Sequence, residues 1–187
     1  MKMESINNYI ALNLSEKRKI HIDGVRETAK KLAAFYHEDQ EKAEIAALFH
    51  DMFRGVSEET LNEYVKEFGL EDKYLNNKNL AHGKIAAVVM KRDYDIQDED
   101  ILNAVAFHTT GRAGMSTLEK IIYLADAMEP NRSYPGVEEL RKLAFENLDE
   151  ACIFSLSRTI EYVRSKKLFL DEETIKAKDF LIKNRRT

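Results

Sequence analysis

Ile45-Ala46-Ala47-Leu48-Phe49-His50-Asp51 is an apolar helical run that ends in two adjacent side chains able to bind metal. Such a run is expected to lie in a core rather than on a surface. An imidazole or carboxylate placed there costs free energy unless it finds a partner. The pair His50 and Asp51 therefore indicates a buried polar site at the end of a helix.

Four further polar side chains stand in similar apolar settings. They are His21 on an amphipathic stretch, His82 at the start of residues 81–90, His108 after residues 101–107, and Asp126 after residues 121–125. One histidine alone is more often a structural residue than a ligand. Convergence of these groups on metal would explain all the placements together. The remaining histidine, His37, lies in a polar stretch and is not included among the candidate ligands.

Helix signals recur along the chain, and strand alternation is hard to find. Ser15, Asp39, Ser57, Asp98 and Ser116 stand where helix N-caps are expected. The predicted helices cover residues 16–36, 40–51, 58–68, 80–92, 99–108, 117–129, 137–145, 149–165 and 172–183. We therefore expect an all-α helical bundle in which the candidate ligands lie on different helices.

The 187 residues are expected to form a single domain over residues 1–187. Its C-terminal helices, about residues 137–187, are expected to pack on the site or to cover it. Tyr134-Pro135-Gly136 is the plainest boundary between subregions, but it is not predicted to divide the domain.

The formal net charge of −4 argues against general binding to nucleic acid or to a membrane surface. The single Cys152 excludes an internal disulfide. The sequence contains no segment typical of a signal peptide or a membrane span. We therefore expect a cytoplasmic protein.

Imidazole and carboxylate groups together favour iron, manganese or zinc over calcium. The order His21, His50-Asp51, Asp126 resembles the H…HD…D signature of the HD-domain superfamily of metal-dependent phosphohydrolases. The resemblance implies an HD-domain helical bundle with His21, His50, Asp51 and Asp126 around a first metal. It also implies that His82 and His108 bind a second metal or the phosphate.

Longer segments narrow the resemblance to YqeK-type HD proteins, the bacterial symmetrical diadenosine tetraphosphate hydrolases. The similarity extends from about Arg18 to the C-terminus. Ile22 and Gly55 depart from the residues that the family usually has there. The segments that carry it are Arg18-Lys19-Ile20-His21, Phe49-His50-Asp51, Ala81-His82-Gly83, Phe107-His108-Thr109-Thr110-Gly111-Arg112, Leu124-Ala125-Asp126-Ala127-Met128-Glu129-Pro130-Asn131-Arg132 and Pro135-Gly136-Val137-Glu138-Glu139-Leu140-Arg141.

This resemblance implies metal-dependent cleavage of the central bridge of diadenosine tetraphosphate, which gives two ADP molecules. Asp51, Asp126, His82 and His108 would be the catalytic residues. The cofactor would be one or two divalent ions per chain, iron in the first place, with manganese or zinc as alternatives. The partners would be the nucleotide substrate and its ADP product, and a homodimer is one option for the oligomeric state.

Cationic and hydroxyl side chains near the expected ligands suit a polyanionic substrate, because arginine can bind phosphate through two parallel hydrogen bonds. Each has a simpler alternative role: surface charge for the arginines, helix capping for the threonines, and core packing for the phenylalanine. The candidate substrate contacts, besides His82 and His108, are Arg18, Arg54, Thr109, Thr110, Arg112, Arg132 and Phe169.

Two other functions compete with this one. The first is an HD phosphohydrolase that acts on another nucleotide, as a nucleotidase or an alarmone hydrolase. The second is a nucleotide-sensing regulatory module that keeps the metal site for structure. The presence of all six candidate ligands weighs against the sensor, since a site that is not catalytic does not need both His82 and His108.

Overall fold

The computed structural model describes residues 2–185, and over that range it contains ten α-helices and one short 3₁₀ helix but no strand. The expected all-α fold is confirmed. The elements are α1 (Lys2–Asn13), α2 (Glu16–Phe35), α3 (Gln40–Phe49), α4 (Glu58–Glu67), η1 (Asp72–Tyr74), α5 (Lys78–Asp93), α6 (Glu99–Ala106), α7 (Thr117–Met128), α8 (Val137–Ala144), α9 (Leu148–Ser165) and α10 (Glu172–Lys183).

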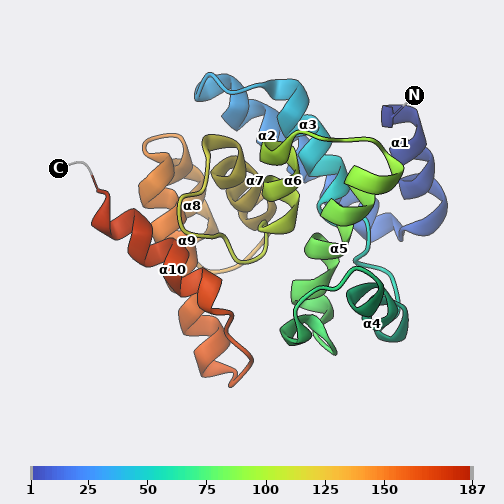
Figure 1. Cartoon of the computed structure of the whole chain (residues 1–187). Coiled ribbons are helices and arrows are strands. Elements are labelled where there is room, and N and C mark those ends of the chain that lie inside the picture. The colour runs from blue at the N-terminus through green and yellow to red at the C-terminus, as the bar shows by residue number, and fades with distance from the viewer. Residues whose placement is uncertain (1, 186–187) are drawn as a thin grey trace.

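Helices α2, α3, α6 and α7 form the middle of the molecule, with α1, α4 and α5 on one side and α8 to α10 on the other (Figure 1). Helix α2 packs on α3 and α7, and α6 packs on α3, α5 and α7. Helix α7 also contacts α8 and α9, and α10 packs on α9. The helices that carry the candidate ligands are thus packed around one another.

The five N-caps expected from the sequence are confirmed. The side chains of Ser15, Asp39, Ser57, Asp98 and Ser116 each accept a hydrogen bond from a backbone N–H in the first turn of their helix. The cap at Ser116 is a complete capping box. These caps satisfy backbone donors that a helix start would otherwise leave without a partner.

Helix α1 was not expected from the sequence. Its residues Ile6 and Ile10, with Leu14 just beyond it, have a spacing of four and are 0%, 9% and 8% exposed. These three side chains form one narrow apolar stripe in an otherwise polar segment, and the helix packs on α3. The spacing was the available signal, but a single short stripe with no cap before it is weak.

Two helices end before the histidines that were expected to belong to them. Helix α3 ends at Phe49 and α6 ends at Ala106, so His50 and His108 lie on the turns that follow. The reason is a local hydrogen bond: the His50 Nδ1 atom donates to the Ala47 carbonyl at 2.6 Å, and His108 Nδ1 donates to the Val105 carbonyl at 2.7 Å. Each imidazole satisfies a carbonyl at the end of its own helix.

Helices α8 and α9 contact α7, and α8 also contacts the loop that follows α7. The Arg141 guanidinium, on α8, donates hydrogen bonds to the backbone carbonyls of Met128, Glu129 and Arg132. This side chain therefore holds the loop after α7 against α8.

In the described part of the chain, no helix has both the length and the apolar character needed to cross a membrane.

Candidate metal centre

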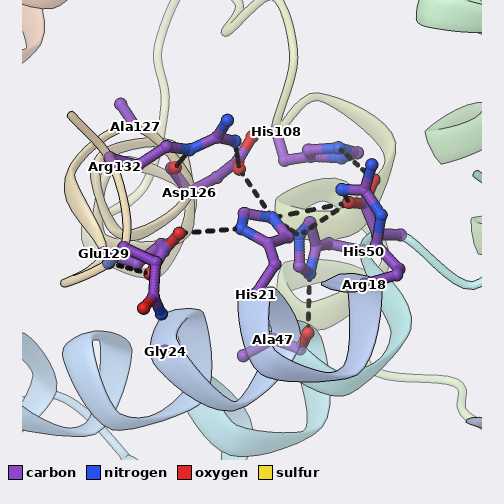
Figure 2. Close-up of polar contacts among 12 residues, drawn as sticks. Arg18, His21, Gly24, Ala47, His50, His108, Asp126, Ala127, Glu129 and Arg132 are labelled. Atoms are coloured by element: carbon purple, nitrogen blue, oxygen red, sulfur yellow. Dashed lines mark hydrogen bonds and ion pairs between the residues drawn. The ribbon is translucent and has the colours of Figure 1, made fainter. Parts of the chain in front are cut away.

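The structure brings together all six side chains that the sequence singled out as candidate ligands. They come from α2, from the turn after α3, from α5, from the turn after α6, and from α7; Figure 2 labels four of them, His21, His50, His108 and Asp126. In order, they are His21, His50, Asp51, His82, His108 and Asp126.

One group of ligand atoms surrounds the Oδ2 atom of Asp51. The Nε2 atoms of His21 and His50 lie 3.4 and 3.6 Å from this oxygen and 3.3 Å from each other. Asp126 Oδ1 lies 3.1 Å from His21 Nε2. His21, His50 and Asp51 therefore form one compact group of ligand atoms, and Asp126 adjoins it through His21; imidazole and carboxylate donors of this kind suit a divalent transition metal.

A second group of ligand atoms surrounds the other oxygen of the same carboxylate. The Nε2 atoms of His82 and His108 lie 3.1 and 4.0 Å from Asp51 Oδ1 and 3.0 Å from each other. Asp51 is 4% exposed, and both histidines are 2% exposed. One buried carboxylate thus faces two separate sets of imidazole nitrogens, an arrangement that can bridge two cations.

The hydrogen bonds of the Nδ1 atoms determine which nitrogen of each ring is available to metal. In His50, His82 and His108, Nδ1 donates to a backbone carbonyl, at 2.6, 3.0 and 2.7 Å respectively. In His21, Nδ1 contacts a carboxylate oxygen of Glu129 at 3.2 Å. Because an acceptor occupies every Nδ1, the neutral form of each ring would point an unprotonated Nε2 into the cluster. The paired Nε2 atoms lie 3.0 to 3.3 Å apart, a spacing that suits a shared proton or two adjacent ligand positions of one metal ion.

Burial and the local charges give the four imidazoles different pKa values. Burial, together with the neighbouring His82 and His50, lowers the pKa of His108 to about 3. Burial also lowers the pKa of His50. At His21 burial acts in the same direction, but hydrogen bonds to Asp126 and Asp51 outweigh it and raise the pKa to about 9. Metal binding at neutral pH must therefore displace a proton from His21, whereas His108 is already neutral.

The two carboxylates remain ionised in this setting. Burial raises the pKa of Asp51, yet His50, His21 and His82 hold it well below its usual value. For Asp126, hydrogen bonding to His21 and the charge of Arg132 likewise outweigh burial and lower the pKa. Both groups are thus anionic ligands at neutral pH.

Arg132 and Arg18 contact the cluster from opposite sides (Figure 2). Arg132 donates from Nε to the Asp126 carbonyl at 2.8 Å and from Nη2 to Asp126 Oδ1 at 2.5 Å. Arg18 forms an ion pair with Asp51 Oδ2. Both guanidinium groups are partly exposed, so each can also contact a substrate phosphate.

The remaining candidate substrate contacts are not all near the cluster. Thr109 Oγ1 lies 3.3 Å from His108 Nε2, whereas Thr110 is buried and donates to the Gly111 carbonyl. Arg54 is bound to Asn79 at 2.7 Å. Phe169 is 58% exposed on the loop between α9 and α10.

Arg112 is held by the helix cap of α7 and not by the candidate ligands. Its Nε and Nη2 atoms donate to the two carboxylate oxygens of Glu119 at 2.7 and 2.6 Å, and Glu119 belongs to the Ser116 capping box. The neighbouring Lys84 places Nζ 3.0 Å from the centre of the Phe107 ring. These cations line a different cavity from the one beside Arg132.

Glu129 contacts a candidate ligand, and the sequence did not single it out, although it lies in one of the quoted segments. It is 2% exposed, and its Oε1 atom contacts His21 Nδ1. Its Oε2 atom accepts from the Asn131 backbone N–H at 2.6 Å and from Asn131 Nδ2 at 3.0 Å. A Cβ atom on Gly24 would lie 2.5 Å from Oε2, so only glycine leaves room for this carboxylate. A carboxylate that orients a metal-binding histidine is typical of metal sites.

Glu129→Gln should weaken metal binding by about 10- to 100-fold, because His21 loses the anionic acceptor that orients its ring. Gly24→Ala should have the same effect through displacement of Glu129. Competition with a chelator measures the metal affinity. Glu99→Gln, which removes an exposed carboxylate paired with Lys91, is the control and should keep the parent affinity. Unchanged affinity in both test variants would show that Glu129 does not position His21.

Comparisons with known proteins agree with the metal centre that the geometry indicates. The HD domain family matches residues 18–131. The symmetrical bis(5'-nucleosyl)-tetraphosphatase of Bacillus subtilis is 38% identical over 97% of this chain and 98% of its own length, and that of Halalkalibacterium halodurans is 42% identical over 87% and 88%. A Clostridium acetobutylicum crystal structure, described as a predicted HD superfamily hydrolase involved in NAD metabolism, superposes with a TM-score of 0.93. It is 45% identical and covers 98% of both chains.

Proposed function

We propose that this chain, which belongs to the HD-domain family and within it to the symmetrical bis(5'-nucleosyl)-tetraphosphatases, hydrolyses diadenosine tetraphosphate to two ADP molecules. The chain is a metal-dependent hydrolase of this family. Related dinucleoside tetraphosphates would be alternative substrates. The cluster of imidazoles and carboxylates supports this assignment because it can bind metal, and the guanidinium groups beside it can bind phosphate.

The observation that carries the proposal is the position of Asp51 between two sets of imidazole Nε2 atoms. His21, His50, Asp126 and one oxygen of Asp51 would hold a first ion. His82, His108 and the other oxygen of Asp51 would hold a second. When bound, such ions would polarise phosphoryl oxygens. They would also lower the pKa of a water molecule and so make hydroxide available at neutral pH.

The protein side chains themselves would bind and orient the polyphosphate. Arg132 and Arg18 would contact phosphate oxygens from the two sides of the cluster, and Thr109 would donate a hydrogen bond from its hydroxyl. Charge that accumulates on the reacting phosphoryl group is best stabilised by donors that are already in place. Arg132 is fixed in this way by Asp126, so little rearrangement is needed.

We further propose that the native metal is iron. Nitrogen and carboxylate ligands without thiolates suit iron, manganese and zinc, and the site offers histidine and aspartate alone. Anaerobic purification followed by metal analysis tests the identity and the number of ions per chain. Zinc or manganese as the sole metal in active protein would contradict the proposal.

Chromatography of the reaction products tests the function directly. With diadenosine tetraphosphate as substrate and ferrous or manganous ion added, ADP should be the sole product, because cleavage occurs at the central bridge. AMP together with ATP would indicate asymmetric cleavage and would contradict the proposed function. Nucleoside monophosphates, deoxynucleotides and alarmones tested side by side should be turned over much more slowly.

Arg132→Ala should lower kcat/KM for diadenosine tetraphosphate by roughly 100-fold, equivalent to about 3 kcal/mol of lost charge-assisted hydrogen bonding. Metal content should change little, since Asp126 keeps its contact with His21. Arg132→Lys should recover only part of the activity. The ammonium group keeps the positive charge but cannot form two parallel hydrogen bonds to a phosphate. Parent-like kinetics for the alanine variant would show that Arg132 does not contact the substrate.

A further inference from the structure

A cavity of about 870 Å³ adjoins the metal centre, between the loop that follows α7 and helix α9. Arg132 lines this cavity and also donates a hydrogen bond to Asp126, so its side chain connects the cavity with the candidate metal centre. The volume lies within the range usual for ligand sites, about 300 to 1,000 Å³. A substrate whose phosphates lie at the metal centre would therefore have room for its organic end next to them.

The side chains of this cavity suit a nucleoside. Tyr134 and Tyr162 contribute aromatic rings, and Thr159 contributes a hydroxyl group, whereas the buried Ser155 hydroxyl donates to the Tyr123 hydroxyl. The Tyr134 hydroxyl donates to the Ala127 carbonyl at 2.8 Å, which fixes that side chain, whereas Tyr162 is 59% exposed. Aromatic rings stack on bases, and hydroxyl groups pair with the polar atoms of a base or a ribose.

The charges of the cavity suit the anionic end of a nucleotide. Arg132 and Arg158 both line it, against the single carboxylate of Glu161. Arg158 donates to the Pro135 carbonyl and packs on the ring of Phe154, so its guanidinium is held in place. The lining is thus locally cationic in a chain whose net charge is −4.

Two other cavities of the described chain also contain aromatic and cationic side chains, but no arginine joins them to the candidate metal ligands. In one of about 500 Å³, Arg112 is bound to both carboxylate oxygens of Glu119. In another of about 410 Å³, Arg92 pairs with Asp93. Neither arginine contacts a candidate metal ligand in the way that Arg132 does.

We propose that the cavity between the α7–α8 loop and α9 binds one nucleoside of the dinucleoside polyphosphate, with its phosphates passing Arg132 to reach the metal centre. This inference rests on the proposed function. Cleavage at the central bridge places the metal centre midway between two nucleosides, and Arg18 lies on the opposite side of the cluster from Arg132 (Figure 2). The second nucleoside therefore extends toward the Arg18 side.

Substitution of Tyr162 tests the cavity. Tyr162→Ala should raise KM for diadenosine tetraphosphate by about 10-fold and leave kcat unchanged, since base stacking acts in both the bound substrate and the transition state. Affinity for ADP, measured by calorimetry on manganese-loaded protein, should fall by a similar factor. Tyr162→Phe keeps the ring and should restore both values. Thr159→Trp, which places a bulky ring in the cavity and leaves less room for a nucleoside, should weaken ADP binding further.

Two controls separate the cavity from the metal centre and from general damage. Inhibition by inorganic tripolyphosphate, which has phosphates but no nucleoside, should be unchanged in Tyr162→Ala. Phe35→Ala removes an exposed ring at the far end of α2 from His21 and should leave KM and ADP affinity as in the parent protein.

Three results would overturn the proposal: unchanged ADP affinity in both Tyr162→Ala and Thr159→Trp, an equal loss of tripolyphosphate inhibition, or a KM effect in Phe169→Ala with none in Tyr162→Ala. The last would place the base on the loop between α9 and α10. Failure of the proposed function is a different result: the parent protein would not hydrolyse diadenosine tetraphosphate, although the ADP measurements would still report on the cavity.

Discussion

Asp51→Ala is expected to lose bound metal and to reduce hydrolysis of diadenosine tetraphosphate below detection, while the helices remain folded. The two oxygens of this carboxylate face the two sets of imidazoles, so its removal takes a ligand from both. The variant also leaves Arg18 without its ion pair, but that side chain is partly exposed and can be solvated. Metal analysis, a turnover assay and circular dichroism measure the three expectations.

His37→Asn is the matched control for this variant. His37 is exposed and has a φ of 57°, a conformation that asparagine tolerates better than alanine. The substitution removes an imidazole without straining the backbone and should leave metal content and activity as they are. Near-normal turnover of Asp51→Ala with metal in excess, or an essential His37, would show that the ligand set is wrong.

The helical fold could be predicted because its signals are local. Each expected N-cap is one side chain within three residues of the backbone N–H that it satisfies, so Ser116 and Asp98 could be recognised without tertiary information. Helix α1 could not, because its stability comes mainly from burying Ile6 and Ile10 against the rest of the protein. In the sequence, packing of that kind is indicated only by the short apolar spacing of the buried residues, which is a weak signal.

The candidate ligands could be found because a buried histidine or carboxylate is conspicuous in an apolar run. Glu129 is the contrasting case: it follows a helix end in a polar segment, and only the structure shows its approach to His21 and the room that Gly24 leaves for it. Arg112 and Arg132 looked equivalent in the sequence. The structure separates them, since Arg112 is bound by Glu119 and Arg132 by the candidate ligand Asp126.

His82→Ala and His108→Ala are expected to keep roughly one tightly bound metal per chain while turnover falls by roughly 1,000-fold, equivalent to about 4 kcal/mol. The reason is the division of ligands at Asp51: these histidines share only its Oδ1 atom, and the group around Oδ2 keeps His21 and His50. Metal analysis after gel filtration and a turnover assay measure the two effects separately. Loss of all metal from either variant would place the primary ion in the group of His82 and His108. Retention of two ions with low activity would mean that these rings contact the phosphate and hold no metal.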